Sequence, residues 1–421
     1  MRKTLPIIVF LLSVALQVCA QQKNYDFQEG KLFYKITDAT KQYVQVSTEL
    51  DELLEATGTL YNSPIKGDVA IPANVNYQGK QYTVTGIGDN AFGGCTQVTS
   101  VSMPASITSL GEQVFLSCTG LKRITVDANN TVLKDVDGVL FDKSGNKLIA
   151  YPNMRAANYD IPEGTVELGA ASFFMCNEIK NINFPPTLKK IGMLAFGICS
   201  KMNEVTIPET VTDLGDFAFY NCTGLEKAII KANISELKRY MFSRCTALKE
   251  VSLPSTIEFI RTWAFGSCAA MKNIKLPDNL KGIEAEAFNG CETLSEITLP
   301  ASLEQIGMYT FDGCKQLKCI TCLRDTPLKG AAMGAGVFEN VDKIACELKV
   351  PKGHRNEYAE AEQWGDFTRI SEHDLSGIST IISQGSNTQT TIFTINGQRL
   401  PNNTQPSHGI YIINGKKVCV K

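Results

Sequence analysis

The sequence predicts an α/β repeat fold, a solenoid of 23-residue coils in which a short strand alternates with a short helical or 3₁₀ turn. Two observations carry this prediction: a phenylalanine returns every 23 residues, and a cysteine follows it at the third position. The regular series comprises Phe173, Phe196, Phe219, Phe242, Phe265, Phe288 and Phe311, with Cys176, Cys199, Cys222, Cys245, Cys268, Cys291 and Cys314. Earlier copies carry Phe92 with Cys95 and Phe115 with Cys118. Such a fixed period is typical of coils that bury their apolar sides by stacking on one another.

Each coil begins with a short alternating run, such as Ile297-Thr298-Leu299, closed by Pro300. Alternation places Ile297 and Leu299 inward and Thr298 outward. Proline cannot donate a hydrogen bond to a sheet, so we expect the strand to end there.

The second half of a coil combines a glycine with the phenylalanine and cysteine. Gly307 represents the glycine, which suits a tight corner where a side chain would clash or where φ must be positive. Phenylalanine, cysteine and a later leucine stand at i, i+3 and i+6, which suits the inward face of a short helical or 3₁₀ turn. Three consecutive coils replace the glycine by Lys238, Arg261 and Glu284, and there we expect wider corners.

The full motif is I-x-I-P-x-x-[VL]-x-x-[IL]-G-x-x-A-F-x-x-C-x-x-L, and it runs from about Val69 to Ile320. It resembles the BspA-like leucine-rich-repeat family of bacterial surface proteins. The resemblance implies a leucine-rich-repeat solenoid. It also implies a cell-surface role, because members of the family are associated with adhesion to extracellular-matrix proteins.

The first 20 residues predict a signal peptide. A basic start at Arg2 and Lys3 precedes an apolar run that ends in Val18-Cys19-Ala20, a small-residue cleavage site. The run is too short to span a bilayer, and no other segment is long enough. Cleavage near Ala20 would leave a protein that is secreted or held on the outer cell surface. Lipidation of Cys19 is the less favoured alternative, because Val18 is large for that processing signal.

The remaining chain divides into a β-rich N-terminal cap, the repeats, a C-terminal cap, a linker and a small β C-terminal module. The predicted boundaries are 21–82, 83–320, 321–370, 371–389 and 390–421. Within the repeats, residues 126–152 hold 12 extra residues that suggest a β-hairpin around a Ser-Gly-Asn turn. This hairpin either projects from one edge of the solenoid or forms an enlarged coil.

The C-terminal module contains three strand-like runs joined by Asn-Gly turns, the strongest short hairpin signal. Its segments Ile395-Asn396-Gly397-Gln398-Arg399 and Gly409-Ile410-Tyr411 resemble the C-terminal sorting domains of Bacteroidetes secreted proteins. The resemblance implies export through the outer membrane. A small β-module without a sorting role is the alternative.

Nine of the 14 cysteines occupy one inward position per coil. Stacked coils hold equivalent Cβ atoms about 4.8 Å apart, whereas a disulfide prefers about 3.8 Å. We therefore expect a buried, reduced ladder of thiols. Cys319 and Cys322 have zinc-ribbon spacing without a second ligand pair, so we expect no metal. A disulfide between Cys322 and Cys346 is a weaker expectation.

The sequence offers little for catalysis, and we expect neither an enzyme nor a cofactor. The three histidines, His354, His373 and His408, all lie outside the repeats. No catalytic triad or phosphate-binding loop is apparent. Acidic residues such as Asp213, Asp216, Glu284 and Glu286 are expected to be scattered on the outer surface, where solvation explains them better than a paired-carboxylate glycosidase site.

We expect a binding protein, an adhesin that contacts a host extracellular-matrix protein or glycan, or a bacterial surface partner, through the repeat surface. Its candidate binding residues, outward on successive strands, are Thr206, Ser252, Lys275 and Thr298. Plain solvation of these side chains is the alternative interpretation. Removing the signal leaves 39 basic against 43 acidic side chains without a basic patch, which argues against nucleic acid. A monomer is expected. A structural spacer and a carbohydrate-processing accessory protein are the alternative functions.

Overall fold

The structure is a computed structural model that describes residues 23–49, 63–374, 392–394, 409–413 and 416–420. The predicted signal peptide, most of the predicted linker and the segment Ile395 to Arg399 lie outside these residues. The chain forms two compact units, residues 1–372 and 373–421, which are described separately below.

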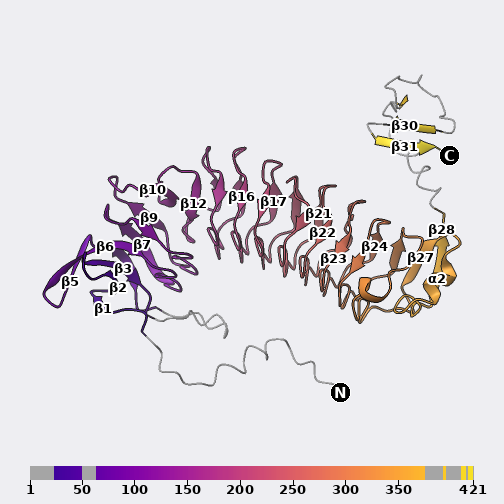
Figure 1. The fold of residues 1–421 in the computed structure, drawn as a ribbon, viewed down its shortest axis with the longest axis horizontal. Coiled ribbons are helices and arrows are strands. Elements are labelled where there is room, and N and C mark those ends of the chain that lie inside the picture. Colours follow the sequence, from indigo (N-terminus) through magenta and orange to yellow (C-terminus); the bar gives the residue numbers. More distant parts are fainter. Residues whose placement is uncertain (1–22, 50–62, 375–391, 395–408, 414–415, 421) are drawn as a thin grey trace, which may run out of the picture. The chain divides into compact units, whose positions relative to one another are not determined.

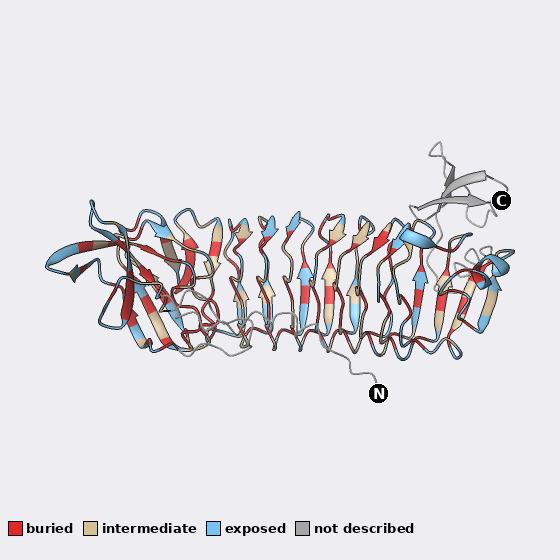
Figure 2. Ribbon diagram, turned by 60° about the horizontal axis from the view of Figure 1, so that its bottom comes forward, coloured by how far each residue is buried: buried red, intermediate tan, exposed pale blue. Residues whose placement is uncertain are grey.

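The first unit is a solenoid whose coils stack in one row, with buried residues facing the inside (Figures 1 and 2). Most coils open with a strand, and these strands pair in parallel in several short sheets, such as β4-β7-β9 and β17-β19-β21. These strands are β4 (Lys66–Ala70), β7 (Gln97–Met103), β9 (Arg123–Val126), β13 (Asn158–Asp160), β15 (Asn181–Asn183), β17 (Glu204–Ile207), β19 (Lys227–Ile230), β21 (Glu250–Ser252), β24 (Glu296–Leu299), β26 (Cys319–Cys322), β27 (Glu347–Pro351) and β28 (Arg369–His373).

A second, shorter row of parallel strands follows the proline turn of each coil. It comprises β8 (Ser109–Leu110), β14 (Glu167–Leu168), β16 (Lys190–Ile191), β18 (Asp213–Leu214), β20 (Glu236–Leu237), β22 (Phe259–Ile260), β23 (Gly282–Ile283) and β25 (Gln305–Ile306). Neighbouring members sit one period apart, as in the pairing of Leu214 with Ile191. The short segment before the glycine is therefore a strand and not only a corner.

The α/β part of the predicted fold class is wrong. The helices among the described residues are η2 (Gly330–Ala332) and α2 (Arg355–Ala359), both outside the regular Phe-Cys coils. The predicted helical or 3₁₀ segment between glycine and cysteine consists of turns. The protein is a leucine-rich-repeat solenoid made almost entirely of short strands and turns.

Residues with a left-handed backbone conformation explain why no helix forms in these segments. In the coil of Phe196, Leu194 has φ 56° and Ile198 has φ 61°, and most other coils repeat this pair of positions. Residues at positive φ interrupt the right-handed backbone that a helix needs. Alternate N–H groups instead donate to the next coil, as Phe196 does to Ala218 at 2.8 Å. The edge of the solenoid that these segments form is called the turn edge below.

The consensus glycine is required by close approach of neighbouring backbones. Gly215 and Gly307 lack a positive φ, but a Cβ atom on either would lie 2.2–2.3 Å from a backbone nitrogen of the preceding coil. Of the two reasons the sequence leaves open, the clash is the one that applies.

A column of phenylalanine rings runs through the core. From Phe173 to Phe338, successive ring centroids lie 4.9–5.9 Å apart, with planes within 21° of parallel. Each ring in this column is at most 1% exposed. Phe338 continues the column past Ile320, where the sequence loses its phase, and Val341 takes the place of the cysteine. Trp364 and Phe367 then pack edge-on against Phe338.

The cysteine ladder is buried and free of disulfides among the described residues. Each thiol of the regular series from Cys199 to Cys314 donates to the carbonyl oxygen of the phenylalanine in the preceding coil, as Cys222 does to Phe196 at 3.0 Å. Cysteine thus combines a small apolar side chain with a thiol that can donate a hydrogen bond to this carbonyl oxygen.

The suggested bridge between Cys322 and Cys346 is absent, because neither residue forms a disulfide in the structure. The parallel register pairs Cys319 with Glu347, which places Cys322 three residues along its strand from that pair and Cys346 one residue in the opposite direction. Four residues along extended strands correspond to roughly 13 Å. Disulfides need Cα atoms within about 7 Å.

The N-terminal part of the unit is a β-sheet that joins the second strand row. β1 (Phe27–Glu29), β2 (Leu32–Asp38), β3 (Tyr43–Ser47), β6 (Lys80–Ile87) and β5 (Asn74–Tyr77) lie in this order, and β8 pairs with β6. Exposed backbone at the end of a solenoid would otherwise present unpaired strand edges.

The extra residues near 126–152 form strands that join the sheet of the second strand row. β10 (Leu133–Val136), β11 (Val139–Asp142) and β12 (Lys147–Ala150) are antiparallel neighbours, and β12 then pairs in parallel with β14. Because Phe141 and Leu148 are buried, the hairpin forms an enlarged coil and does not project.

The second unit contains a three-stranded antiparallel sheet. Its strands are β29 (Ile392–Thr394), β30 (Gly409–Ile413) and β31 (Lys416–Val420). They fall on the three runs that the sequence singles out, and a sorting role for them stays a prediction.

Candidate functional site

All four predicted binding residues are exposed, and three of them lie on strands of the first row. Thr206 on β17 and Ser252 on β21 each pair in register with Ile229 on β19, so they form one line across three coils. Thr298 lies on β24, in register with Thr321. Lys275 continues the line but belongs to a coil without an assigned strand. We call this line of outward side chains the strand ribbon.

A shallow hollow of about 360 Å³ lies beside the strand ribbon, at the start of β17, β19 and β21. Its lining is polar and charged and comprises Asn203, Glu204, Glu226, Lys227, Lys249 and Glu250. Lys249 pairs with Glu226 at 3.0 Å, and Lys227 pairs with Glu250 at 3.3 Å. Glu204 has no ion pair within the described residues, so the hollow carries a slight excess of negative charge.

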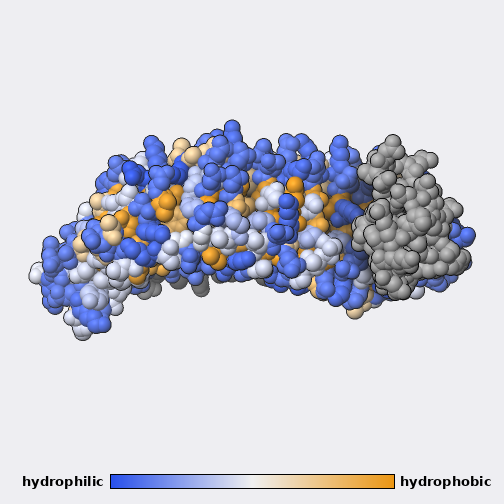
Figure 3. Space-filling model, turned by 90° about the horizontal axis from the view of Figure 1, so that it is seen from above, coloured by the Kyte–Doolittle hydropathy of each residue, from blue (hydrophilic) through white to orange (hydrophobic). Residues whose placement is uncertain are grey.

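Ion pairs between adjacent coils neutralise much of the solenoid surface. Nine of them join residues 23 positions apart: Glu167–Lys190, Lys190–Asp213, Glu178–Lys201, Glu226–Lys249, Lys227–Glu250, Glu258–Lys281, Arg261–Glu284, Glu292–Lys315 and Lys343–Asp366. On the side drawn in Figure 3, hydrophilic residues accordingly line both margins, with apolar residues in a broken band between them. An exposed pair of this kind contributes about 0–1 kcal/mol.

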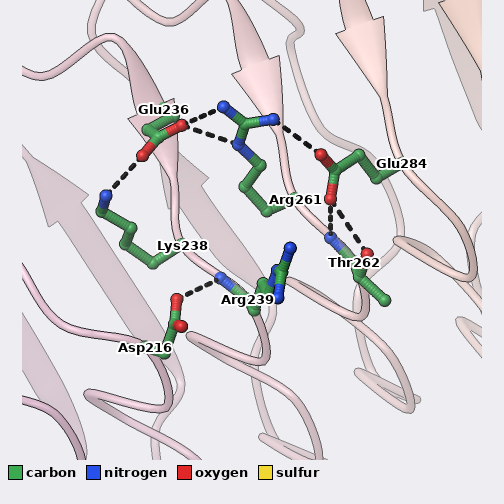
Figure 4. Close-up of polar contacts among 7 residues, drawn as sticks. All are labelled: Asp216, Glu236, Lys238, Arg239, Arg261, Thr262 and Glu284. Atoms are coloured by element: carbon green, nitrogen blue, oxygen red, sulfur yellow. Dashed lines mark hydrogen bonds and ion pairs between the residues drawn. The ribbon is translucent and has the colours of Figure 1, made fainter.

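The three coils that lack the consensus glycine build a connected charge network (Figure 4). Arg261 donates to Glu236 through Nε at 2.6 Å and through Nη2, and to Glu284 through Nη1 at 2.6 Å. Glu236 also accepts from Lys238, while Glu284 accepts from the N–H and the hydroxyl of Thr262, both at 2.9 Å. Arg261 thus links the coil before it to the coil after it.

Both carboxylates in this network are held ionised. Partial burial would raise the pKa of Glu236, but hydrogen bonds from Lys238 and Arg261 outweigh it and lower that pKa below its usual range. The pKa of Glu284 is lowered in the same way, because Arg261 and Thr262 outweigh its desolvation. A carboxylate with a lowered pKa is a poor general acid at neutral pH.

We predict that Arg261→Ala costs about 1 kcal/mol of stability at pH 7, allowing for solvent screening. The folded pKa values of Glu236 and Glu284 are depressed, so their stabilisation is present above about pH 4.5 and is lost as the pH falls below it. Denaturant midpoints of wild type and variant should therefore differ at pH 7 and converge near pH 3. Lys249→Ala, which breaks an exposed pair, is the matched control and should change less at both pH values. Curves that stay separated at pH 3 would contradict this account.

Asp213 and Asp216 do not form a catalytic pair with each other. Asp213 lies 3.8 Å from Lys190, and Asp216 accepts a hydrogen bond from the backbone N–H of Arg239. Glu284 belongs to the network, so the prediction of merely scattered acids is wrong for this residue. Within the described residues, no group of three or more His, Cys, Asp or Glu is arranged to hold a metal ion.

Comparison with known families decides the identity of the fold. The model of the BspA type leucine-rich repeat region matches residues 73–147, 145–271 and 260–352, in six copies. The chain belongs to the BspA-type leucine-rich repeat family. The match extends to residue 352, consistent with the additional coil at Phe338. No curated protein matches the chain.

Solved leucine-rich-repeat proteins resemble the structure. One from Eubacterium ventriosum is 22% identical with a TM-score of 0.52, and the match covers 68% of this chain and 93% of that one. A leucine-rich cell surface protein from Faecalibacterium prausnitzii is 19% identical, with coverage of 86% and 98% and a TM-score of 0.42. The pneumococcal vaccine antigen PcpA is 18% identical, with coverage of 83% and 98% and a TM-score of 0.48. The first of these likenesses shows a shared fold.

Sequence reasoning missed the network around Arg261, although the signal was present. Loss of the glycine in three consecutive BspA-type coils marks the coils that carry it. The partners of Arg261 lie 25 residues before it and 23 residues after it, so a search for opposite charges about one period apart would have found both.

In the part of the chain that the structure describes, no helix is long and apolar enough to cross a membrane.

Proposed function

We propose that this protein is a secreted or cell-surface binding protein, and that its strand ribbon contacts a protein or glycan partner. The observation that carries the proposal is the line formed by Thr206, Ser252, Lys275 and Thr298, four exposed side chains on one face of a rigid repeat. A solenoid offers such an extended face to large ligands.

The chemistry of the ribbon supports a polar partner. Short hydroxyl side chains at Thr206, Ser252 and Thr298 donate and accept hydrogen bonds at little cost in side-chain entropy. The hollow beside them offers further polar groups. Because most nearby charges are paired, hydrogen bonding and shape would govern recognition more than net charge would.

The proposal includes export and excludes catalysis. Residues 1–20 carry the predicted signal peptide, and the family match adds a repeat type known from surface proteins. Glu236 and Glu284, the carboxylates nearest to Arg261, are held ionised. We therefore propose a binding protein and not a glycosidase, with an adhesin role toward a host matrix protein or glycan.

We predict that residues 21–421 bind saturably to at least one member of a panel of immobilised matrix proteins, mucins and glycans at physiological salt. Thr206→Arg with Ser252→Arg should weaken that binding at least tenfold, because two bulky cations would then block the ribbon. Thr212→Arg with Ser235→Arg makes the same changes at exposed sites beside the second strand row and should leave binding unchanged.

Two outcomes would count against the proposal. Equal loss of binding in both double variants would show that the ribbon is not the contact face. Absence of wild-type binding across the whole panel would favour a spacer that displays another module.

A further inference from the structure

Large aromatic side chains occupy one repeated position on the turn edge, two residues before the column phenylalanine. Phe217, Tyr240, Trp263 and Tyr309 all sit there, with φ between 54° and 60°. Left-handed backbone costs an ordinary residue about 1–2 kcal/mol and suits glycine or asparagine best. Bulky residues at this position therefore run against the backbone preference. We call these four residues the aromatic row.

The first three rings of the aromatic row stack on one another. Phe217 and Tyr240 have centroids 4.6 Å apart and planes 3° from parallel, and Tyr240 and Trp263 have values of 6.0 Å and 5°. These three are half-buried, and Tyr309 is 40% exposed. Because each ring covers the face of the next, the row presents ring edges to solvent. Sugar rings pack on open aromatic faces, so exposed edges favour a protein partner.

Cations gather at one end of the row. Arg239 and Arg244 lie in the coil of Tyr240, and both are exposed. Arg244 sits over the ring of Tyr220 at 5.9 Å. Neither arginine has an ion pair with any described residue, in contrast to the paired charges between neighbouring coils.

Acids gather at the other end. Glu286 occupies the aromatic-row position in the coil after Trp263, and Asp312 lies one coil further. Burial raises the pKa of Glu286, an effect that Trp263 opposes by hydrogen bonding and Asp312 reinforces by its charge. Within the described residues, neither acid has an ion pair. Asp216 at the first end accepts a hydrogen bond from the backbone N–H of Arg239, while the two guanidinium groups there stay without an ion pair among the described residues.

The repeat makes the two ends complementary about Trp263. Arg239 lies one coil before Trp263 and Glu286 lies one coil after it, each about 4.8 Å away along the stack. Phe217 lies two coils before Trp263, and Tyr309 lies two coils after it. A two-fold axis at Trp263 would therefore bring Arg239 of one copy against Glu286 of a second copy, and Phe217 against Tyr309.

We propose that the turn edge pairs with the turn edge of a second copy of this chain, antiparallel, around a two-fold axis at Trp263. This homodimer replaces the expectation of a monomer, and it is independent of the function proposed for the strand ribbon. Isologous contacts require such self-complementarity. Aromatic and arginine residues are also the types enriched in protein interfaces.

The contact is short, because five coils span roughly 20 Å. Interfaces at the small end of the range form weak complexes, so we expect a dissociation constant in the micromolar range. Sedimentation velocity of residues 21–421 between 1 and 200 µM should show a monomer passing to a dimer as concentration rises.

Charge reversal tests the two-fold arrangement directly. Arg239→Glu alone should weaken dimerisation at least tenfold, because the introduced carboxylate would then face Glu286 of the other copy. Glu286→Arg alone should do the same by opposing two cations. An equimolar mixture of the two single variants should dimerise again, since each chain then supplies the charge that the other lacks.

A matched reversal on the strand side serves as the control. Glu226→Lys and Lys249→Glu reverse an exposed pair that lines the hollow, and neither should change sedimentation. Circular dichroism should show unchanged melting for every variant compared. A wild type that stays monomeric at 200 µM, or a dimer that both single reversals leave intact, would overturn the proposal. A monomer whose Trp263 fluorescence shifts with an acidic glycan would assign the aromatic row to glycan binding instead.

Discussion

Replacing Phe242 by alanine is expected to lower the free energy of unfolding by about 3–5 kcal/mol, the usual cost of deleting a buried phenylalanine. The ring is fully buried and lies 5.5 Å and 5.7 Å from its two neighbours in the column, Phe219 and Phe265. Its removal leaves a cavity that neighbouring coils cannot close, because backbone hydrogen bonds fix their spacing on both sides, as between Phe242 and Ala264 at 2.8 Å. Denaturant unfolding measures the loss.

The position of Phe242 adds a second readout. Coils in a solenoid are stabilised mainly by their nearest neighbours, so a defect in the middle of the array should weaken coupling between its two halves. Hydrogen exchange should show protection lost first in the coils next to Phe242. Ile344→Ala removes a side chain that is 72% exposed and should change stability by less than about 0.5 kcal/mol. A loss below about 1 kcal/mol for Phe242→Ala would show that the column contributes little.

Inward residues were predictable because a side chain facing the core must recur in every coil. Phe219 and Cys222 do so without a shift in phase, and both are fully buried. The same reasoning placed Thr206 and Thr298 outward. Strand alternation over three residues is enough for such an assignment when a proline fixes where the strand ends.

Backbone conformation between glycine and cysteine was not predictable from spacing. Apolar residues at i and i+3 fit one face of a helix and also fit turns that use a left-handed residue between them. Phe217 at φ 60° and Asn221 at φ 55° show the second solution. The identity of Phe217 gives no warning, because phenylalanine rarely adopts that conformation, although asparagine does so more readily. Bonds between coils, such as Phe219 N–H to Met241 O, decide the outcome, and these depend on stacking.

The candidate sites could be predicted from the sequence only in part, for the same reason. Outward positions follow from a single coil, whereas the Arg261 network and the aromatic row arise only when adjacent coils are compared. Lys238, Arg261 and Glu284 each look like loss of a consensus residue when taken alone. Stacked about 4.8 Å apart, they and their neighbours make continuous surfaces.

Iodoacetamide at pH 8 is expected to label Cys319 in the native protein far faster than any cysteine of the ladder. Cys319 is half-exposed, whereas Cys95, Cys245 and the other ladder thiols are buried. Burial raises the pKa of Cys95 to about 11 and that of Cys314 to about 12. Since the thiolate is the reacting form, these pKa values, compared with the usual value of about 8.5, lower the reactive fraction at pH 8 on the order of a hundredfold or more.

Peptide mapping by mass spectrometry reads each thiol separately. Unfolding in guanidinium should make all thiols react at similar rates, which controls for the intrinsic reactivity of the reagent. The ladder thiols should then appear as free groups, because coil spacing keeps neighbouring sulfur atoms too far apart to bond. Ready labelling of most ladder thiols in the native protein would mean that the coils open on the time scale of the reaction. Ladder thiols that resist labelling even after unfolding would instead indicate disulfides, and the stacking argument for a reduced core would be wrong.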